Sequence, residues 1–281
     1  MICNRQKLYV YCETGIYTMK KKHAILLLLA TAVLSSCRYK GKEITSDTAR
    51  VKELEQAISV KMGEVKNYEA RIVTAITEIY VDAIEYDYDS ELVYRVDEKG
   101  SIFLSASLTL NEQKSEITSY AVDSENYGKV VYTVTKNITT KQTFTEVYSV
   151  IENEGSSSGN TIPAIVALPV RVLETILDPL TYAETFDKNH LFSANYYSKG
   201  DGNLTIEGTE AEYGGDYFGE RYVRTTFDNY VLSYAKIESE SQPSVIERRE
   251  RYEINFKELS ALSISLPDDW EARINKSSSA S

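Results

Sequence analysis

The chain has 281 residues, a formal net charge of −11, and only three cysteines and two histidines. Binding to nucleic acid needs a cationic face that neutralises phosphates, so the acidic balance argues against it. The small number of cysteines and histidines argues against multi-histidine metal sites and Cys–His catalysis. We therefore predict no catalytic residue, no metal ligand and no cofactor.

An apolar run that follows three lysines is the first strong pattern along the chain. Lys20–Lys22 form a positive segment, Ala24–Leu34 are almost entirely apolar, and the small residues Ser35 and Ser36 come next. This order is typical of a secretory signal peptide. The run has roughly ten residues, which is too short for the ~20 that a membrane-spanning helix needs.

The run ends at Leu34-Ser35-Ser36-Cys37, which resembles the lipobox of bacterial lipoproteins: an aliphatic residue and two small residues before a cysteine. The resemblance implies cleavage between Ser36 and Cys37 and attachment of a diacylglycerol to the Cys37 sulfur, with fatty acids such as palmitate. Each buried methylene contributes ~0.8 kcal/mol, so two or three acyl chains hold a polar protein at a bilayer. We therefore expect an extracytoplasmic, membrane-anchored lipoprotein of the bacterial cell envelope. It would lie at the outer membrane or cell surface if the organism has two membranes.

These patterns divide the chain into five parts. Residues 1–18 do not fit a signal peptide, so we expect translation to start at Met19 and residues 19–36 to form the signal. Residues 37–45 form a polar tether, residues 46–270 a single β-rich domain, and residues 271–281 a disordered tail. The mature chain would carry a charge of −15 and no disulfide, since Cys3 and Cys12 lie upstream and Cys37 is acylated.

The domain begins with a predicted helix, and strands dominate after it. Between Ser46 and Tyr68, apolar residues recur at spacings of three and four, and Ser46 or Asp47 can cap the amino end. Residues 102–110 alternate between apolar and polar side chains, as expected for a half-buried strand. Weaker alternation predicts further strands at 116–122, 129–136, 142–151, 190–198, 203–211, 219–227, 229–238 and 245–256.

Turn-forming residues separate several of these strands, at 97–100, 198–203, 213–216 and 228–229. The spacing between strands is too short for crossover helices and favours antiparallel hairpins. We therefore expect a mainly β (α+β) fold, in which a long antiparallel meander of roughly ten strands forms a curved sheet or half-barrel.

Residues 161–182, "TIPAIVALPVRVLETILDPLTY", interrupt the strand pattern with the most apolar stretch of the mature chain. The pattern predicts an amphipathic helix that begins near Pro163, is kinked or broken at Pro169, and ends at Asp178-Pro179. Such a helix must cover an apolar surface. It either packs on the sheet as core or forms a lid over a ligand on a concave sheet.

The order of these elements is similar to that of the lipoprotein-carrier and mycobacterial lipoprotein families, which share a half-barrel closed by helices. The resemblance spans residues 46 to about 270 and implies binding of lipid or acyl chains in the hollow. We expect a non-enzymatic protein that binds a hydrophobic small molecule or lipid. The sequence does not predict its oligomeric state. The candidate ligand-binding residues lie on the helical lid and on the first clear strand: Ile165, Leu168, Val172, Leu173, Ile176, Leu177, Ile102, Leu104 and Leu108.

Two other classes of function remain open. An interaction module could bind protein or glycan through tyrosines of the later strands, namely Tyr196, Tyr197, Tyr213, Tyr217, Tyr222, Tyr230 and Tyr234. A carboxylate-dependent glycosidase would need two acids facing each other across a cleft. Asp87 and Asp89 alternate like calcium ligands but lack the glycine and terminal glutamate of a calcium loop, so we interpret them as part of a solvated turn.

Overall fold

The computed structural model describes residues 41–80, 83–150, 161–177, 191–214, 217–243 and 246–278. The predicted signal peptide, including Ser36, and the predicted acylation site Cys37 lie outside these described residues. None of the helices in these ranges combines the length and the apolar character that a helix needs to span a membrane.

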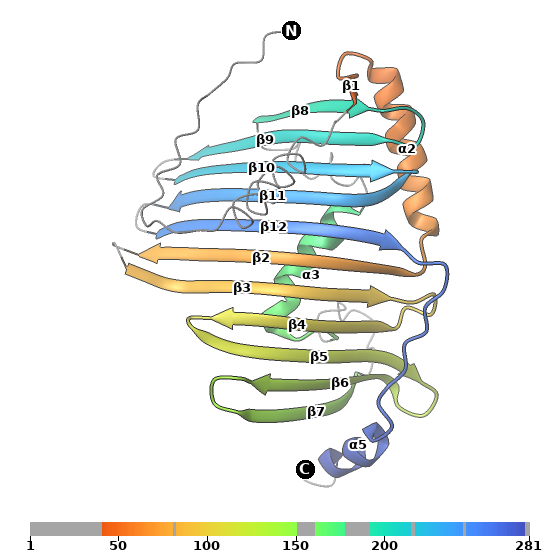
Figure 1. The fold of residues 1–281 in the computed structure, drawn as a ribbon, viewed down its shortest axis with the longest axis vertical. Coiled ribbons are helices and arrows are strands. Elements are labelled where there is room, and N and C mark those ends of the chain that lie inside the picture. Colours follow the sequence, from red (N-terminus) through yellow and green to blue (C-terminus); the bar gives the residue numbers. More distant parts are fainter. Residues whose placement is uncertain are drawn as a thin grey trace, which may run out of the picture. The chain divides into compact units, whose positions relative to one another are not determined.

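In the described part of the chain, twelve strands form one antiparallel sheet, in the order β1-β8-β9-β10-β11-β12-β2-β3-β4-β5-β6-β7 (Figure 1). The sheet is curved and is not closed into a barrel, which confirms the predicted mainly β fold with a curved antiparallel sheet. The strands are β1 (Lys42–Glu43), β2 (Tyr68–Tyr80), β3 (Ala83–Val96), β4 (Ile102–Leu110), β5 (Gln113–Ser124), β6 (Gly128–Asn137), β7 (Gln142–Val150), β8 (Leu191–Ser198), β9 (Leu204–Gly214), β10 (Tyr217–Asp228), β11 (Val231–Pro243) and β12 (Ile246–Glu258).

Two meanders, one from β2 to β7 and the other from β8 to β12, make up this sheet together with the short strand β1, which pairs with β8. They join where β12 pairs with β2, with Glu258 opposite Tyr68 and Ile246 opposite Tyr80. The predicted strands from residue 102 onward correspond to β4–β12. Strands β2 and β3 have no counterpart among the strands predicted from the sequence. The interpretation of Asp87 and Asp89 as part of a solvated turn was wrong, because both residues lie within β3 and pair with β2.

Helix α2 (Thr48–Glu64) lies between β1 and β2 in the chain and runs past one end of the strands (Figure 1). The Asp47 carboxylate caps it by accepting a hydrogen bond from the Arg50 amide at 3.1 Å. Leu54 and Ile58 are fully buried against the sheet, as the spacing of apolar residues predicts. The helix ends earlier than predicted, since Tyr68 already belongs to β2.

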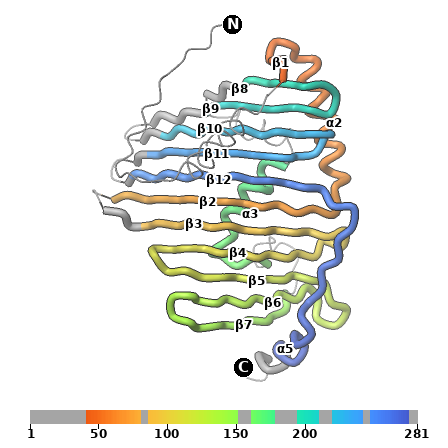
Figure 2. Tube along the Cα trace, viewed as in Figure 1, coloured from red at the N-terminus to blue at the C-terminus, as the bar shows by residue number. Residues whose placement is uncertain are grey.

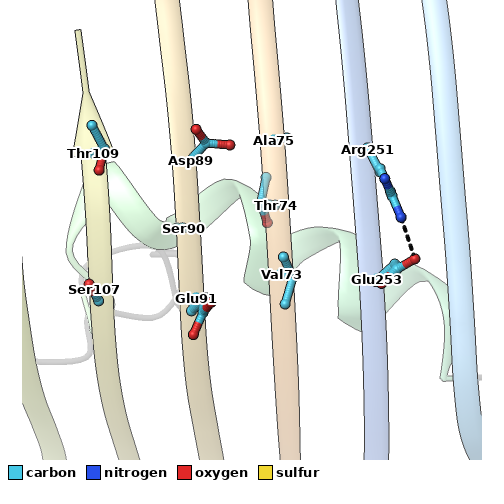
Figure 3. Close-up of a pocket in the computed structure, with 10 residues that line it drawn as sticks. All are labelled: Val73, Thr74, Ala75, Asp89, Ser90, Glu91, Ser107, Thr109, Arg251 and Glu253. Atoms are coloured by element: carbon cyan, nitrogen blue, oxygen red, sulfur yellow. Dashed lines mark hydrogen bonds and ion pairs between the residues drawn. The ribbon is translucent and has the colours of Figure 1, made fainter. Parts of the chain in front are cut away.

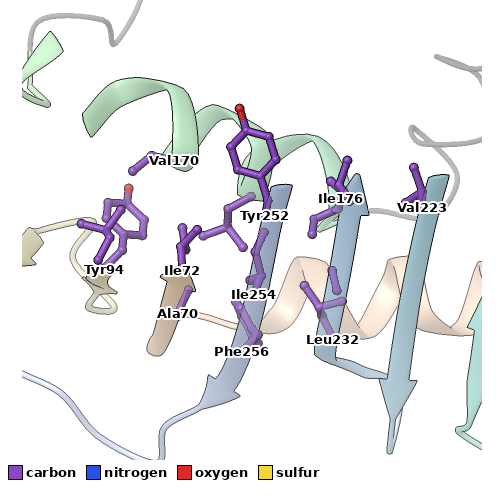
Figure 4. Close-up of a cluster of buried hydrophobic side chains, with 14 of the residues drawn as sticks. Ala70, Ile72, Tyr94, Val170, Ile176, Val223, Leu232, Tyr252, Ile254 and Phe256 are labelled. Carbon is purple, nitrogen blue, oxygen red and sulfur yellow. The ribbon is translucent and has the colours of Figure 1, made fainter. Parts of the chain in front are cut away.

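The two faces of the sheet differ in chemistry. One face is apolar from β9 across to β5, and its side chains form the main core with those of helix α3 (Ala164–Ile176). Figure 4 shows Val170 and Ile176 of α3 above Ile72 and Ile254 of the strands, with the Tyr252 ring reaching up to the level of α3. The opposite face carries ion pairs along neighbouring strands, such as Arg251 with Glu253. This division follows from the alternation of side chains along each strand.

The segment after β12 follows the strand ends towards β7 and finishes in helix α5 (Trp270–Ser278) (Figure 2). Buried Asp97 anchors this segment, because its carboxylate accepts hydrogen bonds from the amides of Lys99, Ser101 and Ile264 at 2.9–3.1 Å. The predicted disordered tail from residue 271 is therefore wrong for residues 271–278. Trp270 and Ile274 are four residues apart, which places both on one helix face and lets them join a small second core.

That second core lies on the sheet face opposite α3, over β6 and β7. Ile274 packs there with Val130, Tyr132 and Val147, and Trp270 contacts the ring of Tyr127 edge-on at 5.4 Å. Tyr132 also donates a hydrogen bond to Asp269 at 3.1 Å. The carboxyl-terminal helix is thus held by both apolar and polar contacts.

Candidate functional site

Helix α3 lies behind β3, β2 and β12 in the view of Figure 3 and covers the apolar face. It is continuous from Ala164 to Ile176, with Pro169 in its interior, so the helix does not break at this proline. Its inward stripe consists of Val166, Val170, Leu173 and Ile176, which retain at most 1% exposure. The spacings of four and three residues within this stripe match the helical period.

One hydrogen bond between α3 and the sheet follows directly from Pro169. In an α-helix the carbonyl of Ile165 would accept a hydrogen bond from the amide of residue 169, but proline has no N–H. The Tyr88 hydroxyl of β3 instead donates to the Ile165 carbonyl oxygen at 3.1 Å. Tyr88 is 2% exposed, so this contact lies within the packed layer and ties the helix to the sheet.

The nine candidate ligand-binding residues occupy three different environments. Leu173, Ile176, Leu104 and Leu108 are buried in the main core, where the helix meets the sheet. Val172, Leu177 and Ile102 are half-buried at its border. Ile165 and Leu168 are 39% and 40% exposed, because they lie on the side of α3 that faces away from the inward stripe.

Buried hydroxyl groups interrupt the apolar face beneath α3. Thr74 on β2 lies opposite Ser90 on β3 and opposite Tyr252 on β12. Tyr88 is two residues from Ser90 on the same strand and therefore faces the same side. All four side chains are at most 4% exposed. We call Thr74, Tyr88, Ser90 and Tyr252 the hydroxyl cluster.

The tyrosines of this face stay protonated at neutral pH. Burial raises the pKa of Tyr88 and of Tyr252, and the nearby Glu250 carboxylate raises that of Tyr252 further. Burial also raises the pKa of Tyr68 to about 12, with a smaller contribution from the charge of Glu174 on α3. These phenols are therefore hydrogen-bond donors and do not serve as bases in this state.

A charged group borders the hydroxyl cluster on one side. Arg248 of β12 pairs with both Glu78 and Glu250, and Glu250 accepts a hydrogen bond from the Tyr252 hydroxyl at 3.2 Å. The three charges sum to −1. Arg248 is therefore already neutralised by two carboxylates.

The opposite face of the sheet carries a shallow polar groove of about 440 Å³ across β4, β3, β2 and β12. Figure 3 shows the side chains of Asp89, Glu91, Thr109 and Arg251 on this face, with α3 behind the sheet. Arg251 forms an ion pair with Glu253 at 2.7 Å. The groove is open and polar, so it does not suit a purely hydrophobic ligand.

The later-strand tyrosines do not form an exposed aromatic patch where their side chains are described. Tyr196, Tyr197, Tyr222, Tyr230 and Tyr234 are all only partly accessible. Tyr196 and Tyr230 pack against the main core, and Tyr222 donates a hydrogen bond to Glu207 at 2.5 Å. The side chains of Tyr213 and Tyr217 lie outside the described residues. More exposed aromatic side chains occur on β7, where Phe144 is 56% and Tyr148 39% exposed.

Within the described ranges, no three His, Cys, Asp or Glu side chains come together in a way that could hold a metal ion. No protein-family model matches the chain, and no curated protein is similar to it. The chain is similar in structure to a DUF1329 family protein from Desulfovibrio piger, solved by crystallography. The identity is 10%, the TM-score is 0.23, and the match covers 79% of this chain and 98% of that chain. Neither fold nor function is inferred from this similarity.

Sequence reasoning missed the hydroxyl cluster. Its members come from β2, β3 and β12. Strands β2 and β12 pair with each other although they lie near opposite ends of the domain in sequence. The sequence of β2 gives little signal for it: Ala70, Ile72, Thr74 and Ile76 share the buried face, but Val73 and Ala75, the neighbours of Thr74, are apolar as well. The local pattern therefore does not predict which way Thr74 faces or which hydroxyls lie beside it.

Proposed function

We propose that the protein is a membrane-anchored extracytoplasmic lipoprotein that binds a hydrophobic ligand, such as an acyl chain, between α3 and the apolar face of the sheet. The single observation that carries the proposal is the extent of this face. It continues from β9 to β5, and in the described part of the chain α3 is the helix that lies across its middle. Contacts of this kind are non-directional, so a ligand chain can replace them.

Burying the α3 side chains on the apolar face and burying an acyl chain there contribute similar free energies. Fully burying an aliphatic side chain contributes about 1.5–3 kcal/mol, so the four residues of the inward stripe of α3 contribute about 6–12 kcal/mol. An acyl chain of sixteen carbons contributes about 12 kcal/mol at ~0.8 kcal/mol per methylene. A long-chain ligand can therefore displace the α3 side chains at little net cost. An eight-carbon chain contributes only about 6 kcal/mol, so it should displace them less readily.

Ligand capture is tested with the purified protein and the neutral fluorescent probe N-phenyl-1-naphthylamine, followed by competition with fatty acids of eight and sixteen carbons. The probe should bind, and the longer acid should displace it far more effectively. Leu173→Asp places a charge beneath α3 and should abolish probe binding, whereas Leu168→Asp on the exposed side should not. Circular dichroism checks that both variants remain folded. Absence of probe binding by the folded parent protein would contradict the proposal.

The lipid anchor needs a separate test, because ligand binding and membrane attachment are independent. Cells that express the full chain are labelled with radioactive palmitate, and the membrane fraction is compared for the parent and for Cys37→Ser. We expect label only in the parent and loss of the variant from the membrane fraction. Palmitate that remained on the serine variant would rule out Cys37 as the acylated residue.

A further inference from the structure

The hydroxyl cluster sets polar groups in the middle of an otherwise apolar layer. Directly opposed residues on neighbouring antiparallel strands have Cβ atoms about 4.5–5.5 Å apart, so Tyr252, Thr74 and Ser90 form a row across three strands. Ile72 and Ile76 flank Thr74 along β2 on the same face, and both are at most 2% exposed. Apolar side chains therefore flank the row along β2, while Glu250 borders it along β12.

Thr74 is the clearest sign that this row has a role beyond packing. It is 1% exposed, and its hydroxyl oxygen has no hydrogen-bond partner among the described residues. A buried hydroxyl without a partner destabilises a protein, and valine has almost the same shape without that cost. A hydroxyl at this position is useful if a bound molecule supplies the partner.

Two further hydroxyls can turn towards such a molecule. Tyr88 donates to the Ile165 carbonyl of α3, a bond that must break when α3 moves away from the sheet. Tyr252 donates to Glu250 and lies directly opposite Thr74. An oxygen atom of the ligand would then replace the Ile165 carbonyl as the acceptor of the Tyr88 hydroxyl.

The charge around the cluster discriminates between head groups. The adjacent charged side chains are Glu78, Arg248 and Glu250, and the arginine is held by both carboxylates. A carboxylate or phosphate head group would lose its hydration there and lie beside a net negative charge. A hydroxyl or ester group avoids this penalty and still accepts hydrogen bonds.

We propose that the ligand beneath α3 is an amphiphile with a long acyl chain and an uncharged hydroxyl- or ester-bearing head group, which binds at the hydroxyl cluster. The inference rests on the proposed function and adds the class of ligand. The acyl chain follows the apolar face, and the head group hydrogen-bonds to Thr74 and Tyr88.

The test compares 1-monooleoylglycerol with oleate at pH 8, because the two share one chain and differ in the charge of the head. Displacement of N-phenyl-1-naphthylamine from the full chain gives both dissociation constants. The parent protein should bind monooleoylglycerol more tightly than oleate. Thr74→Val should weaken binding of monooleoylglycerol about fivefold, the effect of one lost hydrogen bond, and leave oleate binding unchanged.

Thr225→Val is the matched control. Thr225 lies on the same face of the sheet, is 2% exposed and also has an unpartnered hydroxyl, but it belongs to β10, outside the cluster. Both variants should fold and be at least as stable as the parent, and the control should bind both ligands normally.

The possible results separate the inference from the proposed function. If both ligands bind but Thr74→Val leaves monooleoylglycerol binding unchanged, the hydroxyl cluster has no role and the inference is overturned while ligand binding stands. Tighter binding of oleate than of monooleoylglycerol also overturns it. If the folded parent protein does not bind the probe at all, the proposed function fails.

Discussion

The packing of α3 predicts that Leu173→Ala strongly destabilises the protein. Leu173 is completely buried between the helix and the sheet. Truncating a leucine in such a position costs about 2–5 kcal/mol, because apolar contacts are lost and a cavity remains. A loss near 3 kcal/mol should lower the melting temperature of a domain of this size by about 6–12 °C.

Leu168→Ala is the internal control, since it removes the same atoms from the same helix. Leu168 is 40% exposed, so its truncation should cost no more than about 1 kcal/mol. Thermal unfolding is followed by circular dichroism, and urea unfolding gives the free energy and the slope m. The midpoint should shift for Leu173→Ala with m unchanged. Equal losses for the two variants would refute the described orientation of α3.

Three further predictions concern polar contacts. Tyr88→Phe should lower the free energy of unfolding by about 1–3 kcal/mol, because the Ile165 carbonyl loses its hydrogen-bond donor. This cost should shrink in a Pro169→Ala background, where the amide of residue 169 can donate to the carbonyl instead. Urea unfolding of the parent, the two single variants and the double variant measures the difference. Burial raises the pKa of Glu55 above 4.5, so this residue favours the folded state most below pH 4.5, and its contribution is lost as the pH rises through the raised folded-state pKa. Glu55→Gln should therefore be more stable than the parent at pH 7 and show a flatter pH profile of unfolding; a steeper profile would contradict the assignment. Asp97→Ala should lose about 2 kcal/mol and speed thermolysin cleavage in the segment after β12, which contains leucine and isoleucine but no lysine or arginine; unchanged cleavage would mean that Asp97 does not anchor it.

Local pattern was sufficient for the strands whose two faces differ sharply. The alternation at 102–110 predicts β4, and it correctly places Leu104 and Leu108 on one buried face. In β3, acidic residues occupy the polar positions, and the run "EYDYDSE" therefore resembles a turn. Yet Tyr88 and Leu92 alternate with Asp89 and Glu91, and this period of two was a usable strand signal.

Other features depend on contacts that a local pattern does not encode. The orientation of α3 depends on which of its apolar stripes meets the sheet, and the sequence offers two stripes of similar character. The bond from Tyr88 to the Ile165 carbonyl needs the register of β3 against α3. Helix α5 was missed because its polar composition hides Trp270 and Ile274, whose partners lie on β6, on β7 and in the turn before β6.

The pairing of β12 with β2 has a consequence for the nascent chain. Tyr68 meets Glu258, so the strand that seals the middle of the sheet is synthesised roughly 190 residues after the strand it seals. Until then the first meander has an open hydrogen-bonding edge along β2, which is a template for pairing with another copy. Ribosomes and transport machinery release a polypeptide amino end first, so a chaperone that shields this edge would raise the yield of correctly assembled molecules.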